Sequence, residues 1–63
     1  MNQKSEYHVQ RENERGKDFY RRGNFVDALQ SFERVREILE AHASDSLDLA
    51  ATYNNIALVY DAR

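Results

Sequence analysis

The sequence predicts an all-α fold, an antiparallel helix–turn–helix unit followed by a third helix. Its 63 residues include no Pro and only two Gly, which favours long uninterrupted helices over a turn-rich β fold. Apolar residues recur at helical spacing in three segments, and turn-forming residues stand between those segments. Hydrophobic residues make up 41% of the chain and the net charge is only −2, a composition that differs from that of a disordered chain. We therefore expect three packed helices and no strand.

The first helix is expected over residues 5–22, with the polar segment 1–11 as an N-terminal extension that continues into it. Its apolar line is sparse and consists of Val9, Gly16, Phe19 and Tyr20. Asp18 and Arg22 stand four residues apart in the acid-first order that supports a helix. Gly23 follows two Arg residues, which is typical of a helix C-terminus because Gly readily adopts the left-handed conformation.

The second helix is expected over residues 25–43, with Asn24 as its N-cap. Its apolar residues have spacings of three and one, which form a helical stripe: Phe25, Ala28, Leu29, Phe32, Val35, Ile38 and Leu39. The opposite face is polar and charged, as expected for one side in water: Gln30, Glu33, Arg34, Glu37 and Glu40. We expect Phe32 to lie where this helix meets both neighbours, against Phe19 and Ile56.

The third helix is expected over residues 47–62, with Ser46 as its N-cap. One apolar stripe is expected to face the second helix and consists of Leu49, Tyr53, Ile56, Ala57 and Tyr60. A second apolar set lies on another side and consists of Ala51, Leu58 and Ala62, with Val59 beside it. The helix is thus apolar over more than the arc of about 100° that a surface helix needs. It is expected to have neighbours on two sides.

Six spaced residues within the first two helices form a recognisable pattern. The stretch resembles one tetratricopeptide repeat, a helix–turn–helix unit: Gly16-x-x-Phe19-x-x-x-Gly23-Asn24-Phe25-x-x-Ala28-x-x-x-Phe32. Small residues at 16 and 28 would let the two helices approach closely, and the aromatic residues would fill the remaining space. Segment 53–60 looks like the first helix of a second repeat, since Ala57 and Tyr60 follow Gly16 and Phe19 by 41 residues. This period is longer than the common one of about 34 residues and is similar to the elongated repeats of the kinesin light chain type.

The resemblance divides the chain into a first hairpin at 12–43 and the first helix of an incomplete second repeat at 44–63. The sequence departs from the repeat pattern at Glu12 and Arg15, where a large aromatic residue and Leu are usual, and at Glu40, near the usual Pro. The sequence leaves open whether the chain is complete or part of a longer array, which typically needs about three repeats for stability.

A concave groove lined by the first helix of each repeat is what the resemblance implies for ligand binding. Peptide-groove candidates are the polar and aromatic residues at the matching positions, Asn13, Lys17, Tyr20, Arg21, Asn54 and Asn55, with Leu58 beside them. Some members of the family hold a C-terminal carboxylate with a clamp of Lys, Asn and Arg over three repeats. Only Asn55 matches that clamp, so the clamp is not predicted.

The function expected from the sequence is a non-catalytic protein–protein interaction module that binds a protein or peptide. We also expect it to self-associate, with a dimer favoured, through the second apolar set of the last helix: Ala51, Leu58, Val59 and Ala62. Covering apolar surface contributes about 25 cal/mol per Å², which matters in a chain this short. Helices exchanged between copies at the Ser44–Ser46 turn remain possible. The alternative is a purely structural self-assembly unit, or a piece of a longer repeat scaffold, with no peptide ligand.

The sequence contains few residues that would support metal binding, catalysis, nucleic-acid binding or membrane insertion. His8 and His42 have no His or Cys partner at ligand spacing, so neither a metal nor another cofactor is predicted. The acidic run at Glu33, Glu37 and Glu40 is expected to be a solvated face, and no catalytic residue is predicted. The charge balance gives no basic footprint for nucleic acid or an anionic membrane. Short apolar runs and a polar N-terminus predict no membrane span and no secretory signal, hence a cytoplasmic protein.

Overall fold

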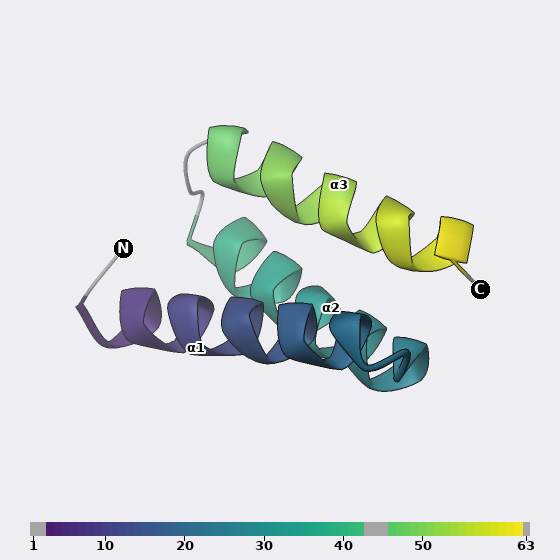
Figure 1. Cartoon of the computed structure of the whole chain (residues 1–63). Coiled ribbons are helices and arrows are strands. Elements are labelled where there is room, and N and C mark those ends of the chain that lie inside the picture. The colour runs from purple at the N-terminus through teal and green to yellow at the C-terminus, as the bar shows by residue number, and fades with distance from the viewer. Residues whose placement is uncertain (1–2, 43–45, 63) are drawn as a thin grey trace.

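The computed structural model describes residues 3–42 and 46–62, with side chains described for 7–42 and 49–62. It contains three α-helices, α1 (Gln3–Arg21), α2 (Phe25–Ala41) and α3 (Ser46–Ala62), and none of the described residues is in a strand. The chain reverses direction at each connection, so that α2 runs antiparallel to both α1 and α3 (Figure 1). The predicted all-α class is confirmed.

The helix ends differ from the prediction by one or two residues. Segment 1–11 is helical from Gln3 onward, and α1 ends at Arg21 rather than at residue 22. The second helix ends at Ala41; the predicted end at residue 43 and most of the Ser44–Ser46 turn lie outside the described residues. Helix α3 begins at Ser46, so it includes the residue predicted to precede it.

The turn between α1 and α2 is a Schellman motif. Gly23 has a φ of 80°, in the left-handed region. The Asn24 amide donates to the Phe19 carbonyl at 2.9 Å and the Gly23 amide donates to the Tyr20 carbonyl at 3.1 Å, the two bonds that define the motif. The predicted role of Gly23 is confirmed. Asn24 occupies the N-cap of α2 as predicted, but its side chain makes no capping hydrogen bond.

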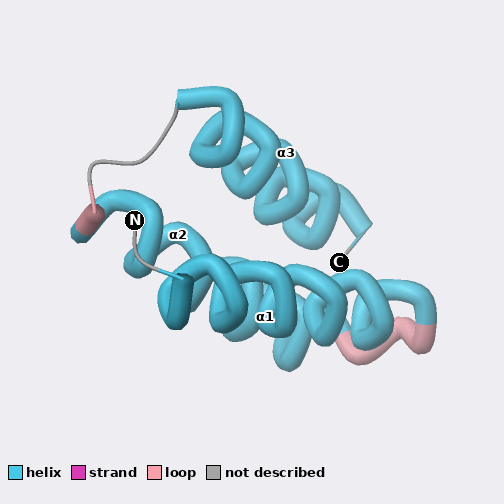
Figure 2. The backbone as a smooth tube through the Cα atoms, turned by 90° about the vertical axis from the view of Figure 1, so that its left-hand side faces the viewer, coloured by secondary structure: helices cyan, strands magenta, loops and turns pink. Residues whose placement is uncertain are grey.

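The core lies on α2, which packs against α1 and α3 (Figures 1 and 2). Phe32 is 2% exposed and forms one buried cluster with Ala28, Ile56 and Val59. Partly buried apolar residues from α1 and α2 pack against this cluster: Phe19, Tyr20, Phe25 and Leu29. The predicted position of Phe32 between its two neighbouring helices is therefore confirmed.

Gly16 sets how closely α1 approaches α2. A Cβ atom at this position would lie 2.5 Å from Cε1 of Phe32, well inside van der Waals contact. The absence of a side chain at Gly16 therefore leaves the space that the Phe32 ring occupies. This contact is the physical reason for the small residue that the sequence pattern has at this position.

The face that α3 presents to α2 differs from the prediction. Thr52, Ile56 and Val59 are buried, whereas Tyr53 and Tyr60, predicted to be core residues, are 48% and 55% exposed. Ala57 of the same predicted stripe is also exposed. The buried face is offset by one residue from the predicted stripe, and it places the Tyr53 ring where its hydroxyl donates to Glu40 Oε1 at 2.6 Å.

A polar contact links α1 to α2 at a position where the sequence lacks the usual apolar filling. The Arg34 guanidinium on α2 lies 3.5 Å from the Glu12 carboxylate on α1. Glu12 thus joins the two helices electrostatically rather than by packing. Arg34 is mostly exposed, so this pair contributes about 1 kcal/mol or less.

Candidate functional site

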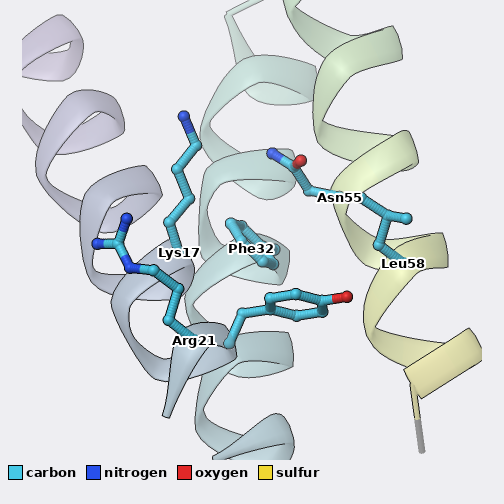
Figure 3. Close-up of a pocket in the computed structure, with 6 residues that line it drawn as sticks. Lys17, Arg21, Phe32, Asn55 and Leu58 are labelled. Atoms are coloured by element: carbon cyan, nitrogen blue, oxygen red, sulfur yellow. The ribbon is translucent and has the colours of Figure 1, made fainter. Parts of the chain in front are cut away.

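A cleft of about 220 Å³ lies between α1 and α3, with α2 beneath it. Residues from all three helices line it: Lys17, Tyr20, Arg21, Phe32, Asn55 and Leu58. Lys17 and Arg21 extend from α1, Asn55 and Leu58 project from α3, and the Phe32 ring lies between the two walls (Figure 3). The antiparallel packing of three helices therefore creates one site from residues up to 41 positions apart in the sequence.

The α1 wall carries two cations one helical turn apart. Lys17 forms no ion pair with any described residue. Arg21 lies 3.9 Å from an Asp18 oxygen, while the other Asp18 oxygen lies 3.1 Å from Arg22. Asp18 is therefore held chiefly by Arg22, and the Arg21 guanidinium lies on the side of α1 away from α3 (Figure 3).

Tyr20 lines the same cleft and is oriented by an aromatic neighbour. Its ring meets that of Phe25 edge to face, with 5.7 Å between the centroids and 63° between the planes. Such pairs are favourable beyond the burial of area, by about 0.5–1.5 kcal/mol. The contact fixes an aromatic side chain at the border of the cleft and links the cleft to the core.

The floor and the α3 wall supply apolar surface and one amide. Phe32 belongs to the buried core but also lines the cleft, and Leu58 is 45% exposed across from it. Asn55, on the same helix, is partly buried and offers both a donor and an acceptor. None of the residues that line the cleft carries a carboxylate. The cleft thus combines positive charge, an apolar floor and a neutral hydrogen-bonding group.

Four of the six predicted groove residues lie at this cleft: Lys17, Tyr20, Arg21 and Asn55. Asn13 lies on α1 one turn before Lys17 and does not line the cleft; its Oδ1 atom is buried without a hydrogen-bond partner. Asn54 is exposed outside the cleft. The sequence assigned Phe32 to the core alone, and a stripe of apolar residues contains no signal that one of them also borders an opening.

The predicted self-association residues fall on two different faces of α3. Ala51, Leu58 and Ala62 are exposed, as an interface with another copy requires. Val59 is fully buried against α2, so its assignment to the outer face is corrected. The offset of one residue that exposes Tyr53 and Tyr60 is also what turns Val59 inward. Leu58 belongs both to the cleft wall and to the outer apolar set.

Tyr53 and Glu40 form a second polar contact between helices, away from the cleft. The hydrogen bond to Glu40 raises the pKa of Tyr53 above its ordinary value, because it stabilises the protonated phenol beside a negative charge. Arg36 lies 4.0 Å from the same carboxylate and acts in the opposite direction. The contact connects the C-terminal part of α2 to α3, and its exposure suits a structural role.

A second hollow lies elsewhere on the described part of the chain. A shallow hollow of about 230 Å³ on the first half of α1 is lined by Tyr7, Gln10, Arg11 and Glu14. Among the described residues there is no group of His, Cys, Asp and Glu that could hold a metal ion. Within the same residues, no helix is long and apolar enough to cross a membrane.

No protein-family model, curated protein or solved structure matches this chain. The functional argument therefore rests on the residues and geometry of the cleft. Of the two hollows described above, only the cleft is lined by residues of all three helices, and its lining includes both cationic and apolar side chains.

Proposed function

We propose that this chain is a non-catalytic protein–protein interaction module of the tetratricopeptide repeat type, which binds a peptide in the cleft between α1 and α3. One observation carries the proposal. The repeat pattern in the sequence implied a groove at specified positions, and four of those positions surround one cleft of about 220 Å³. The groove that the resemblance implies and the cleft that results from helix packing therefore share four residues.

The chemistry of the cleft suits a peptide. Binding sites combine an apolar surface with a few polar groups that fix orientation. Leu58, which is 45% exposed, supplies most of the apolar surface, with Phe32 beneath it at the floor. Asn55 can pair with both the N–H and the C=O of an extended backbone. The cleft is also small and open, which suits a few residues of a peptide rather than a whole folded surface. The proposal includes a cytoplasmic location, which microscopy of the tagged chain tests.

The experiment is selection of binding peptides from a displayed random library, followed by NMR mapping. Adding a selected peptide to the isotope-labelled chain should shift the backbone amide signals of Lys17, Arg21 and Asn55. The amides of Val26 and Glu37, which are exposed outside the cleft and outside the outer face of α3, serve as internal controls. Shifts centred on the controls, or a library that yields no binder, would contradict the proposal.

A second candidate function, self-assembly through the outer face of α3, is favoured by the exposed residues Ala51, Leu58 and Ala62. A contact between two copies along a two-fold axis lets one such patch pair with itself. Sedimentation velocity over a range of protein concentrations distinguishes the two functions, because only self-assembly makes the sedimentation coefficient rise with concentration in the absence of peptide.

A further inference from the structure

The two connections between the helices differ in the residues that form them. The turn before α2 contains Gly23 at a φ of 80°, and a residue in this region ends a helix because it redirects the chain. The sequence between α2 and α3, residues 42–45, contains neither Gly nor Pro. His42 has right-handed backbone angles (φ −100°, ψ 10°), and its amide donates to the Ile38 carbonyl at 3.2 Å, as in a helix that continues. The residue types of the second connection are therefore compatible with a helix.

The buried faces of α2 and α3 are in the register of one uninterrupted helix. Buried or partly buried residues of both helices form two rows with a spacing of seven: Ala28, Val35, Leu49 and Ile56 in the first row, and Ser31, Ile38, Thr52 and Val59 in the second. Both rows cross the connection without a shift, and residues 42 and 45 occupy the intervening positions. Such a repeat places all its members on one seam between two helices that wind around each other.

We infer, beyond the proposed peptide binding, that two copies of this chain exchange α3. Residues 25–62 of each copy then form one continuous helix, and α3 packs on α2 of the other copy. The two long helices run antiparallel about a two-fold axis near residues 43 and 44, so that residue 28 of one copy meets residue 59 of the other. In the single chain Ala28 and Val59 already belong to one buried cluster, and the exchange rebuilds that contact between copies.

The exchange gains backbone hydrogen bonds and keeps the side-chain contacts. Four carbonyl groups at the end of α2 and four amides at the start of α3 have no partner within their own helix, and a continuous helix joins them. Helix α3 packs mainly on α2, so its transfer breaks one helix contact and remakes the same one. Association costs freedom of motion, and a tethered helix competes at an effective concentration in the millimolar range. The dimer is therefore weak, with a Kd of the order of 0.1 mM.

Exchange makes each cleft a site shared by two copies. Tyr20 and Phe32 come from α1 and α2 of one copy, whereas Asn55 and Leu58, which project from α3, come from the other (Figure 3). The dimer has two such clefts, and each is incomplete without the second copy.

A side-by-side dimer through the outer face of α3 is the competing arrangement, and the two dimers differ in length. The single chain has a longest extent of 32 Å. A continuous helix over residues 25–62 is about 57 Å long, at about 1.5 Å per residue. Small-angle X-ray scattering at about 1 mM should therefore give a largest dimension of at least about 57 Å.

Isotope-filtered NMR on the original chain tests the exchange itself. Labelled and unlabelled chains are unfolded together and refolded at about 1 mM, so that the filter records only contacts between copies. Nuclear Overhauser effects should connect the Phe32 ring of one copy with methyl groups of Ile56 and Val59 of the other, since these residues share one buried cluster. In a side-by-side dimer these contacts stay within one copy.

Substitutions at residue 44 vary the helix propensity of the connection. Ser44→Ala should tighten the dimer about fivefold and Ser44→Gly should weaken it about fivefold, because each change acts in both copies. Ser44→Pro should weaken it at least about a hundredfold, because Pro interrupts a helix. Ala51→Glu is the control on the exposed outer face of α3 and should leave the Kd of the exchanged dimer within about twofold. Sedimentation equilibrium measures each Kd.

Three results would overturn the exchange. The first is a dimer without contacts between Phe32 of one copy and α3 of the other, and dissociation of that dimer by Ala51→Glu would assign it to the outer face. The second is a Ser44→Ala chain that stays monomeric at about 1 mM. The third is a dimer much shorter than about 57 Å, or one that Ser44→Pro leaves intact, since either excludes the continuous helix. Peptide binding is measured separately, by amide shifts at the cleft of the single chain, and stands or fails independently of these results.

Discussion

Replacing Phe32 with Ala would test the core and the cleft at the same position. Phe32 is 2% exposed and packs against Ala28, Ile56 and Val59, with Gly16 close to the edge of its ring. Removing a buried aromatic side chain costs about 3–5 kcal/mol, from lost transfer free energy and from the cavity left behind. Because Phe32 also borders an open cleft, water can enter part of that cavity. We therefore expect a loss near the lower end of the range, about 3 kcal/mol.

A loss of this size is large for so short a chain. Folded domains have free energies of unfolding of roughly 0.05–0.15 kcal/mol per residue, about 3–9 kcal/mol for this length. The loss of about 3 kcal/mol would leave about 0–6 kcal/mol, so that at the low end of this range only half of the molecules are folded at 25 °C. A destabilisation of 1 kcal/mol lowers the midpoint temperature of a domain of this size by about 4–8 °C, so Phe32→Ala should lower it by more than about 12 °C.

The assay is urea and thermal denaturation followed by circular dichroism at the helical minimum, with protein concentration held constant. Val26→Ala is the matched control, since Val26 is 58% exposed on the same helix and its truncation should change the free energy of unfolding by no more than about 0.5 kcal/mol. A Phe32→Ala variant that melts within about 3 °C of the original chain would show that α2 does not pack against α1 and α3 through this residue.

Three further predictions follow from contacts between helices. Gly16→Ala should lower the urea midpoint despite a gain in helix propensity of about 1 kcal/mol, because its Cβ would lie 2.5 Å from the Phe32 ring. The same substitution should be less destabilising in a chain that also carries Phe32→Leu. A urea midpoint of the single variant Gly16→Ala above that of the unsubstituted chain would refute the close contact. Ala51→Glu should reduce the concentration-dependent rise in sedimentation coefficient without loss of helix, and an original chain that stays monomeric across the micromolar range would defeat self-association. Glu40→Gln should lower the raised pKa of Tyr53, measured by absorbance titration of the phenol. Because this pKa is higher in the folded than in the unfolded chain, the hydrogen bond stabilises the folded chain fully below pH about 10. That stabilisation should be lost as the pH rises through the pKa of Tyr53 in the folded chain.

The periodic parts of the fold were predictable because a single apolar face identifies what a helix buries. In α2 the stripe is unbroken and its opposite face is charged, so the buried positions Phe32, Val35 and Leu39 follow from spacing alone. The Schellman turn was predictable because Gly23 follows the last turn of α1 and no other residue takes positive φ as easily.

The face of α3 could not be predicted in the same way. This helix is apolar on several sides, so more than one stripe satisfies the spacing rule, and the larger side chains Tyr53 and Tyr60 made the wrong stripe more attractive. Packing instead favours the small Thr52 beside Ile56 and Val59, because a short side chain lets α3 lie close to α2. Ser31 on α2 is also buried, although a polar residue is not expected in the core from its type alone.

The candidate site was predictable where it depends on one helix. Lys17, Tyr20 and Arg21 share a face of α1 through their spacing of three and four residues, so the resemblance to a repeat placed all three correctly around the cleft. The contribution of α2 required the packed structure, because Phe32 borders the cleft only when α1 and α3 are separated above it.

Leu58 lies at the boundary between the cleft and the outer face of α3, and the two proposed contacts therefore compete for one side chain. A bound peptide and a second copy of the chain that both cover Leu58 would exclude each other. By thermodynamic reciprocity, each would weaken the other to the same degree. The apparent affinity for peptide would then fall as the protein becomes more abundant, so that occupancy of the cleft would report the ratio of peptide to protein rather than the amount of peptide alone.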